Sequence, residues 1–125
     1  MKLMKIETVG SSAVTANLAR IIDISRVVDA IPGATTAVIN YANAAGALKT
    51  ITFTLTGAAT NSNAEKLLNA QRVCDWFMGK VQELNGPASN QKGVYYLGDH
   101  AAMTLAAGLT FTGAATEPLT TIAFS

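Results

Sequence analysis

Near Gly57 the hydrophobic period of the chain changes from two to about 3.5, and this change restricts the folds open to it. Before that point, residues 48–56 alternate threonines with apolar side chains, which is the pattern of a strand with one buried face. After it, residues 63–84 place apolar side chains three and four positions apart, which is the pattern of an amphipathic helix. Both apolar faces must be buried. We therefore expect a helix packed on a sheet.

The sequence marks both ends of this helix. Ser62 and Glu65 form an S-x-x-E capping box, in which the hydroxyl and the carboxylate accept hydrogen bonds from backbone amides at the helix start. The residues Asn85-Gly86-Pro87 supply a stop signal. The predicted apolar stripe consists of Leu67, Ala70, Cys74, Phe77, Val81 and Leu84. The helix is expected to pack on the sheet through this stripe.

The other segments are typical of strands and turns. Residues 35–42 and 48–56 predict a hairpin around a glycine-containing loop, and Pro32-Gly33 predicts the turn before it. Further strands are expected over residues 2–9, 93–98, 102–113 and 119–125. The predicted fold class is α+β, with a strongly bent antiparallel sheet or small barrel and one long helix over residues 63–84.

Two segments need separate treatment. In residues 14–31, apolar side chains recur at helical spacing but many are β-branched; a strand is expected for the second half, and residues 14–25 stay open between helix and strand. The segment TGAAT occurs at residues 56–60 and again at 112–116, but only the first copy leads into a helix. We therefore predict two equivalent strand ends at Gly57 and Gly113, and no duplicated functional unit.

The length and charge of the chain limit the classes of protein to which it can belong. A chain of 125 residues fits a single domain over residues 1–125. Charged residues make up 14% of the chain, against roughly 25% in ordinary soluble domains, which is typical of a surface buried against other copies or neighbours; the alternative is a threonine-rich monomer. A net charge of +1 supplies no general attraction for nucleic acid or acidic membranes. With no signal peptide or spanning segment, we expect a soluble protein without a membrane partner.

The sequence predicts no catalytic residue, metal site or cofactor site. Cys74 is the only cysteine, which excludes a disulfide framework or a multi-thiolate metal site within one chain. His100, the only histidine, follows Asp99 but lies in no triad or metal-binding motif. An enzyme would need a pocket around this pair and Tyr95 or Tyr96. We therefore expect a protein that is not an enzyme.

Arg72, Trp76 and Lys80 are the candidate residues for contact with a partner or a nucleic acid. At about 100° per residue, Trp76 lies opposite Leu67 and thus on the polar side of the helix, with Arg72 and Lys80 one turn away on either side. An indole flanked by two cations can stack on a base or anchor a partner protein. The alternative is that the protein's own N-terminal segment or a neighbouring subunit covers the indole.

The middle of the chain resembles small proteins abundant in marine viral sequences, especially those attributed to cyanophages. The resemblance covers roughly residues 26–84 and rests on RVVDAI, TTAVINY, the glycine-loop hairpin into TITFTLTG, and the capped helix ending in VQEL. Members of that group are similar to Sm-like folds, in which strongly bent antiparallel strands with a helix form rings by strand-edge pairing. The resemblance implies a homo-oligomer of phage origin with an assembly or structural role.

The same resemblance implies a location in the virion or in the cytoplasm of the infected host, with other virion proteins as further partners. Sm-like relatives bind RNA or DNA, so the alternative function is a ring that binds nucleic acid. The chain departs from Sm proteins in two ways: it lacks the glycine-containing loop that grips a base, and its helix follows the hairpin instead of opening the domain. The resemblance therefore supports ring assembly of this chain more strongly than nucleic-acid binding, and it assigns no binding residue to this sequence.

Overall fold

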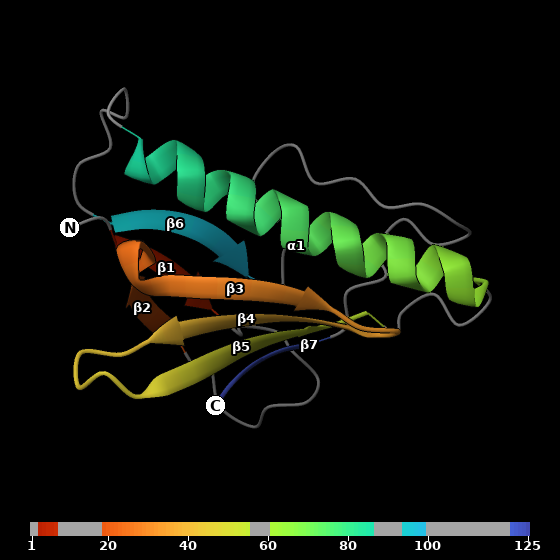
Figure 1. Ribbon diagram of the computed structural model, residues 1–125, viewed down its shortest axis with the longest axis horizontal. Helices are drawn as coiled ribbons and strands as arrows, with labels where there is room; N and C mark the ends of the chain where they lie inside the picture. Colours follow the sequence, from red (N-terminus) through yellow and green to blue (C-terminus); the bar gives the residue numbers. More distant parts are fainter. Residues whose placement is uncertain (1–2, 8–18, 56–60, 87–93, 100–120) are drawn as a thin grey trace.

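The computed structural model describes residues 3–7, 19–55, 61–86, 94–99 and 121–125 (Figure 1). In chain order the elements are β1 (Leu3–Glu7), β2 (Ala19–Asp23), the 3₁₀ helix η1 (Ile24–Arg26), β3 (Val27–Pro32), β4 (Thr36–Ala42), β5 (Leu48–Thr54), α1 (Asn63–Asn85), β6 (Val94–Asp99) and β7 (Thr121–Phe124). The predicted α+β class is confirmed. No helix of these residues is long and apolar enough to cross a membrane.

The described strands form two sheets. The larger has the order β3-β4-β5-β7 and is antiparallel throughout, as expected. The smaller has the order β2-β1-β6, in which β1 pairs with β2 antiparallel but with β6 parallel. The parallel pair corrects the expectation of a purely antiparallel fold; it is possible because the chain between β1 and β6 is long enough for a crossover that includes α1. Neither sheet closes among the described residues, so a barrel is not shown.

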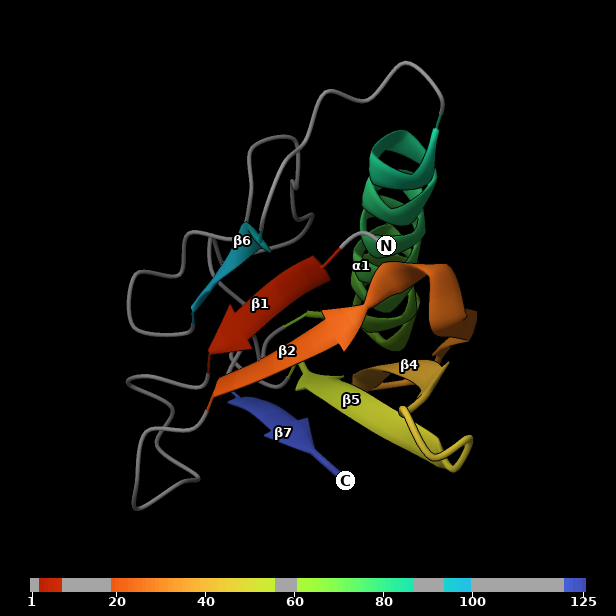
Figure 2. The ribbon, with the colours of Figure 1, turned by 90° about the vertical axis from the view of Figure 1, so that its left-hand side faces the viewer.

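The bend between the sheets occurs at η1, where β2 continues into β3 (Figure 2). The Asp23 side chain caps this turn by accepting a hydrogen bond from the Ser25 amide at 3.0 Å, and Ile24 is buried in the core. The open choice for residues 14–25 is therefore settled for residues 19–25, which form a strand and a single 3₁₀ turn. Residues 14–18 lie outside the described part.

The core lies between the two sheets and α1, as Figure 2 shows in a view along the helix. The hairpin alternation is confirmed, because Ile51, Phe53 and Leu55 are buried while the threonines between them are half-buried on the opposite face. The rings of Phe53 and Phe77 pack at 6.2 Å between centroids with an interplanar angle of 60°. Such tilted aromatic pairs add to the stability gained from burial. This contact ties α1 to the centre of the larger sheet.

Helix α1 matches its prediction at both ends. The Ser62 hydroxyl accepts from the Glu65 amide at 3.2 Å, and the Ser62 amide donates to Glu65 Oε1 at 3.0 Å, so the capping box is complete. The helix ends at Asn85, one residue beyond the expected end. Five of the six predicted stripe residues are buried, but Leu67 is 41% exposed. Val73 and Asn69 are buried as well, so the buried face is turned toward them and away from Leu67.

Both predicted turns of the larger sheet are formed. Gly33 donates to the Thr36 carbonyl at 2.7 Å between β3 and β4. In the hairpin loop, Gly46 adopts φ +85°, and the Asn43 side chain accepts from the amides of Ala45 and Ala47. The predicted strand over residues 102–113 and the predicted strand ends at Gly57 and Gly113 lie outside the described residues.

Candidate functional site

Trp76 lies at the margin of the buried face of α1. Its side chain is half-buried, packs against the core, and holds its Nε1 where no atom of the described residues accepts a hydrogen bond. Trp76 follows buried Asn69 by seven residues, or about two helical turns, so the two share one side of the helix. The polar side assigned by counting from Leu67 is therefore a boundary between core and solvent. The core covers part of the indole, which leaves less of it for a base or a partner.

Arg72 and Lys80 lie one turn from Trp76 on either side, as their spacing requires, and both are half-buried. Lys80 Nζ lies 3.2 Å from Glu83 Oε2, and the Glu83 side chain is 66% exposed. The Lys80 charge is thus paired within the helix. The side of α1 that holds Arg72, Trp76 and Lys80 also carries the Glu83 carboxylate next to Lys80. Its positive charge is therefore partly neutralised, which weakens attraction for the phosphates of a nucleic acid.

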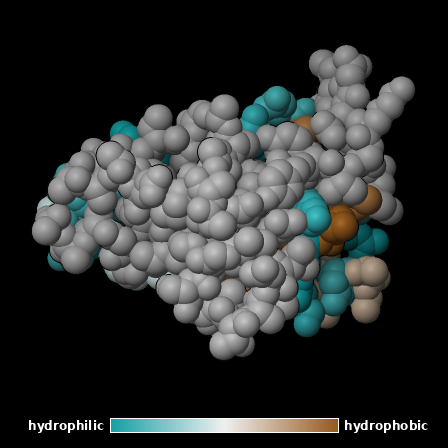
Figure 3. Space-filling view, turned by 180° about the vertical axis from the view of Figure 1, so that it is seen from behind, coloured by the Kyte–Doolittle hydropathy of each residue, from teal (hydrophilic) through white to brown (hydrophobic). Residues whose placement is uncertain are grey.

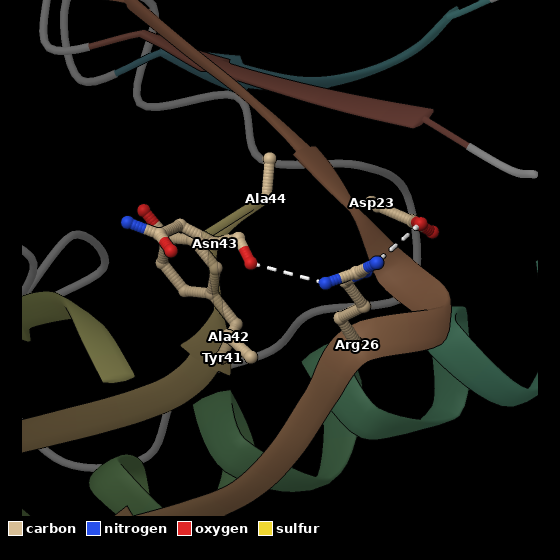
Figure 4. Close-up of a pocket in the computed structure, with 6 residues that line it drawn as sticks. All are labelled: Asp23, Arg26, Tyr41, Ala42, Asn43 and Ala44. Atoms are coloured by element: carbon tan, nitrogen blue, oxygen red, sulfur yellow. Dashed lines mark hydrogen bonds and ion pairs between the residues drawn. The ribbon is translucent and has the colours of Figure 1, made fainter. Parts of the chain in front are cut away.

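A pocket of about 210 Å³ lies between η1 and the β4–β5 hairpin loop (Figure 4). Its lining residues are Asp23, Arg26, Tyr41, Ala42, Asn43 and Ala44. Arg26 Nη1 donates to the Asn43 carbonyl at 3.1 Å, and Arg26 Nε lies 3.7 Å from Asp23 Oδ2. The Ser25 hydroxyl bonded to Asp23, with smaller help from Arg26, lowers the pKa of that carboxyl. The charged groups of this pocket are already paired with each other, which is the arrangement of a structural link between η1 and the hairpin.

A second link lies next to this pocket. Arg20 Nη1 donates to the buried Tyr41 hydroxyl at 2.9 Å, and the Arg20 guanidinium lies 5.0 Å from the centroid of the Phe124 ring. Arg20 therefore joins β2 of the smaller sheet to β4 and β7 of the larger sheet. The hydrogen bond satisfies a phenol that would otherwise lose water without a partner. We assign Arg20 and Tyr41 a structural role.

The residues named for metal binding, reactivity or an enzyme can be examined only in the described part of the chain. The described residues hold no cluster of three or more His, Cys, Asp or Glu side chains that could bind a metal ion. Burial raises the pKa of the Cys74 thiol to about 11, so the thiol is neutral at physiological pH. Of the residues named for an enzyme, Tyr95, Tyr96 and Asp99 lie in β6, whose side chains are not described, and His100 lies outside the described part.

The described surface exposes several large apolar side chains, namely Ile21, Val28, Ile31, Leu48, Leu67 and Leu68. Val28 and Ile31 are 60% and 53% exposed, and both lie on β3, which is one of the two edge strands of the larger sheet; β7 is the other. Seen from behind, described apolar and polar residues lie side by side at one edge of the molecule (Figure 3). The sequence predicts a strand for the second half of residues 14–31, which includes Val28 and Ile31, but it does not indicate that these two side chains are exposed.

Comparison of the chain with protein-family models, with curated proteins and with solved structures gives no match.

Proposed function

We propose that this chain is a non-enzymatic protein that assembles with copies of itself. The observation that carries the proposal is strand β3, which has no described partner on its outer edge and exposes Val28 and Ile31 beside it. Natural proteins protect such edges with lysines, prolines or bulges. β3 has a bulge after Val27 and a proline at its end, Pro32, but between them it presents no lysine. Among the described residues, no strand pairs with that part of the edge.

The outer face of the larger sheet supports the same proposal. It places Thr36 opposite Thr54 and Val38 opposite Thr52, all half-buried and uncharged. With 14% charged residues and a net charge of +1, the chain has little charge with which to keep copies apart. The resemblance to cyanophage proteins adds a phage-encoded structural role, in the virion or in the cytoplasm of the infected host, to this proposal.

The test is the mass of the protein in solution. Multi-angle light scattering after size-exclusion chromatography, at concentrations on the order of 1 to 100 µM, should give a multiple of the 13.0 kDa chain mass. Because association follows mass action, the mass should rise with concentration if the contact is weak. A mass of 13.0 kDa at every concentration would contradict the proposal.

A further inference from the structure

We propose that two copies pair through β3 as antiparallel neighbours, with Ala30 of one copy opposite Ala30 of the second copy. The inference rests on the proposed self-association and names its site and symmetry. Two sheets of order β3-β4-β5-β7 would then join at β3 into one continuous sheet. A two-fold pairing of this kind closes on itself and leaves each β3 edge covered.

The direction of the backbone groups of β3 singles out Ala30. In an antiparallel ladder, opposite residues alternate between pairs that exchange both backbone hydrogen bonds and pairs that exchange none. Gly33 donates to Thr36, which marks that pair as hydrogen-bonded. Counting back in steps of two along the register, Ile31 and Val38 form a hydrogen-bonded pair, whereas Ala30 and Ile39 do not. The amide and carbonyl of Ala30 therefore point to the free edge.

The pairing of β4 with β5 supports this direction independently. Leu55 donates to the Thr35 carbonyl at 2.7 Å, so the odd-numbered residues of β4 are those that bond to β5. Ile39 belongs to that set. Its backbone groups are directed to β5 and are not available to Ala30, although the two residues are opposite each other. Both ladders therefore leave the Ala30 amide and carbonyl facing outward.

Two-fold symmetry, together with a complete hydrogen-bonded pair on the axis, selects the register. An axis perpendicular to the sheet makes one residue face itself, and a closed pair of hydrogen bonds forms only if the groups of that residue point outward. Asp29 and Ile31 could face themselves only as non-hydrogen-bonded pairs, because their backbone groups face β4. Pro32 has no amide hydrogen, and Val28 lies in the bulge. Ala30 meets the condition.

The same register is compatible with the side chains. Asp29 of one copy lies opposite Ile31 of the second copy, so the two Asp29 carboxylates do not face each other. Asp29 already accepts a hydrogen bond from Asn40 Nδ2 of its own copy at 2.6 Å, which satisfies one of its oxygens. The exposed Ile31 side chain loses water against the second copy. Both α1 helices lie on the same face of the joined sheet.

Ala30→Pro is the first test. It removes the amide hydrogen at the centre of the proposed contact but no bond to β4, so the dimer should dissociate with a dissociation constant raised at least about tenfold. Ile31→Glu is the second variant, because in this register it faces Asp29 of the second copy, where like charges oppose pairing, and it does not enter the core. Leu48→Glu is the matched control: Leu48 is 63% exposed on β5 of the same sheet, away from the β3 edge, and its replacement should leave the mass unchanged.

A cross-link tests the register directly. Hydrogen-bonded residues opposite each other have Cα atoms about 5.5 Å apart, within disulfide range. Ala30→Cys should therefore form a covalent dimer under mild oxidation, whereas Leu48→Cys and the wild-type chain with its buried Cys74 should not. If the wild type is oligomeric but Ala30→Pro, Ile31→Glu and Ala30→Cys all behave as the wild type, the β3 contact is wrong and self-association stands. A wild type of 13.0 kDa overturns both.

Discussion

The indole of Trp76 is partly buried against the core, and we expect it to contribute to the stability of the fold. We expect Trp76→Ala to lower the free energy of unfolding by about 2–3 kcal/mol, through lost burial and an incompletely filled space. Trp76→Phe should cost less than about 1 kcal/mol, since it keeps most of the ring and removes the buried Nε1 donor, which has no acceptor among the described residues. Urea unfolding followed by circular dichroism gives both values.

The same two variants separate this interpretation from the nucleic-acid alternative. If the indole stacked on a base, Trp76→Ala would reduce salt-dependent retention of an oligonucleotide while the free energy of unfolding stayed near that of the wild type. That result would contradict the structural role assigned to Trp76. Arg72→Ala serves as the second variant for the oligonucleotide measurement, because it removes a cation from the same side of α1 without touching the indole.

Cys74 should react slowly with alkylating reagents. Burial first, and the neighbouring Asp75 carboxylate second, raise the pKa of its thiol to about 11 from an ordinary 9.0. At about pH 8 the thiolate fraction is then about a hundredfold lower than for an ordinary thiol, and alkylation by iodoacetamide should slow by at least that factor. Ala45→Cys, at an exposed hairpin position, provides the fast reference within the same chain. Equal rates at both positions would show that Cys74 is accessible as a thiolate.

The raised pKa of Cys74 also predicts how the stability of the protein depends on pH. The unfolded chain loses the thiol proton near pH 9 while the folded chain keeps it to about pH 11. Between these values the folded state binds more protons, so the stability due to the neutral thiol is complete below pH 9 and falls as pH rises. Urea midpoints measured across this range should decrease for the wild type and decrease less for Cys74→Ala.

At the scale of elements, two glycines in equally open surroundings should respond to alanine in opposite ways. A Cβ added at Gly46 or at Gly79 meets no atom within 4 Å, so only the backbone decides. Gly46 has φ +85° in the hairpin loop, and Gly46→Ala should destabilise the protein by about 1 kcal/mol. Gly79 lies within α1, and Gly79→Ala should stabilise it by about 0.5–1 kcal/mol. Thermal unfolding of both variants gives the change in stability of each. If both variants are stabilised, or both destabilised, the backbone conformation is not what decides the effect.

Elements with local signals could be predicted from the sequence. Ser62 and Glu65 define the start of α1 through bonds between neighbouring residues, and the threonine alternation defines β5 because each side chain needs only its own strand. The turn at Gly33 is equally local. For these elements propensity and tertiary packing agree, so a short stretch of sequence is sufficient.

The remaining features depend on contacts between distant residues. The parallel pairing of β1 with β6 and the bend at η1 are decided by how two sheets enclose one core, which no local period encodes. The margin position of Trp76 follows from the burial of Asn69, a polar residue that hydrophobic counting leaves out of the stripe. The exposure of Val28 and Ile31 follows from the place of β3 at the sheet edge. The candidate contact surface could therefore not be located before the strand order was known.

At the scale of the whole molecule, one cluster of buried residues drawn from both sheets and α1 forms the core. Arg20 crosses between the sheets by its contacts with Tyr41 and Phe124. Both observations indicate that the sheets resist separation. The proposed association would use an edge that is already ordered, because β3 is held between β4, α1 and the η1 bend.

The response of the assembly to salt follows from this picture. The proposed contact consists of backbone hydrogen bonds and the Ile31 side chain and pairs no opposite charges, and the chain carries a net charge of only +1. Screening shortens the range of ionic contacts from about 10 Å at about 0.1 M salt to about 3 Å at about 1 M, but it does not weaken apolar burial. We therefore expect the mass from light scattering to stay constant or rise between about 0.05 and about 1 M sodium chloride. Dissociation at the higher concentration would show that ion pairs hold the copies together, and the contact would then have to be sought among the charged residues instead of along β3.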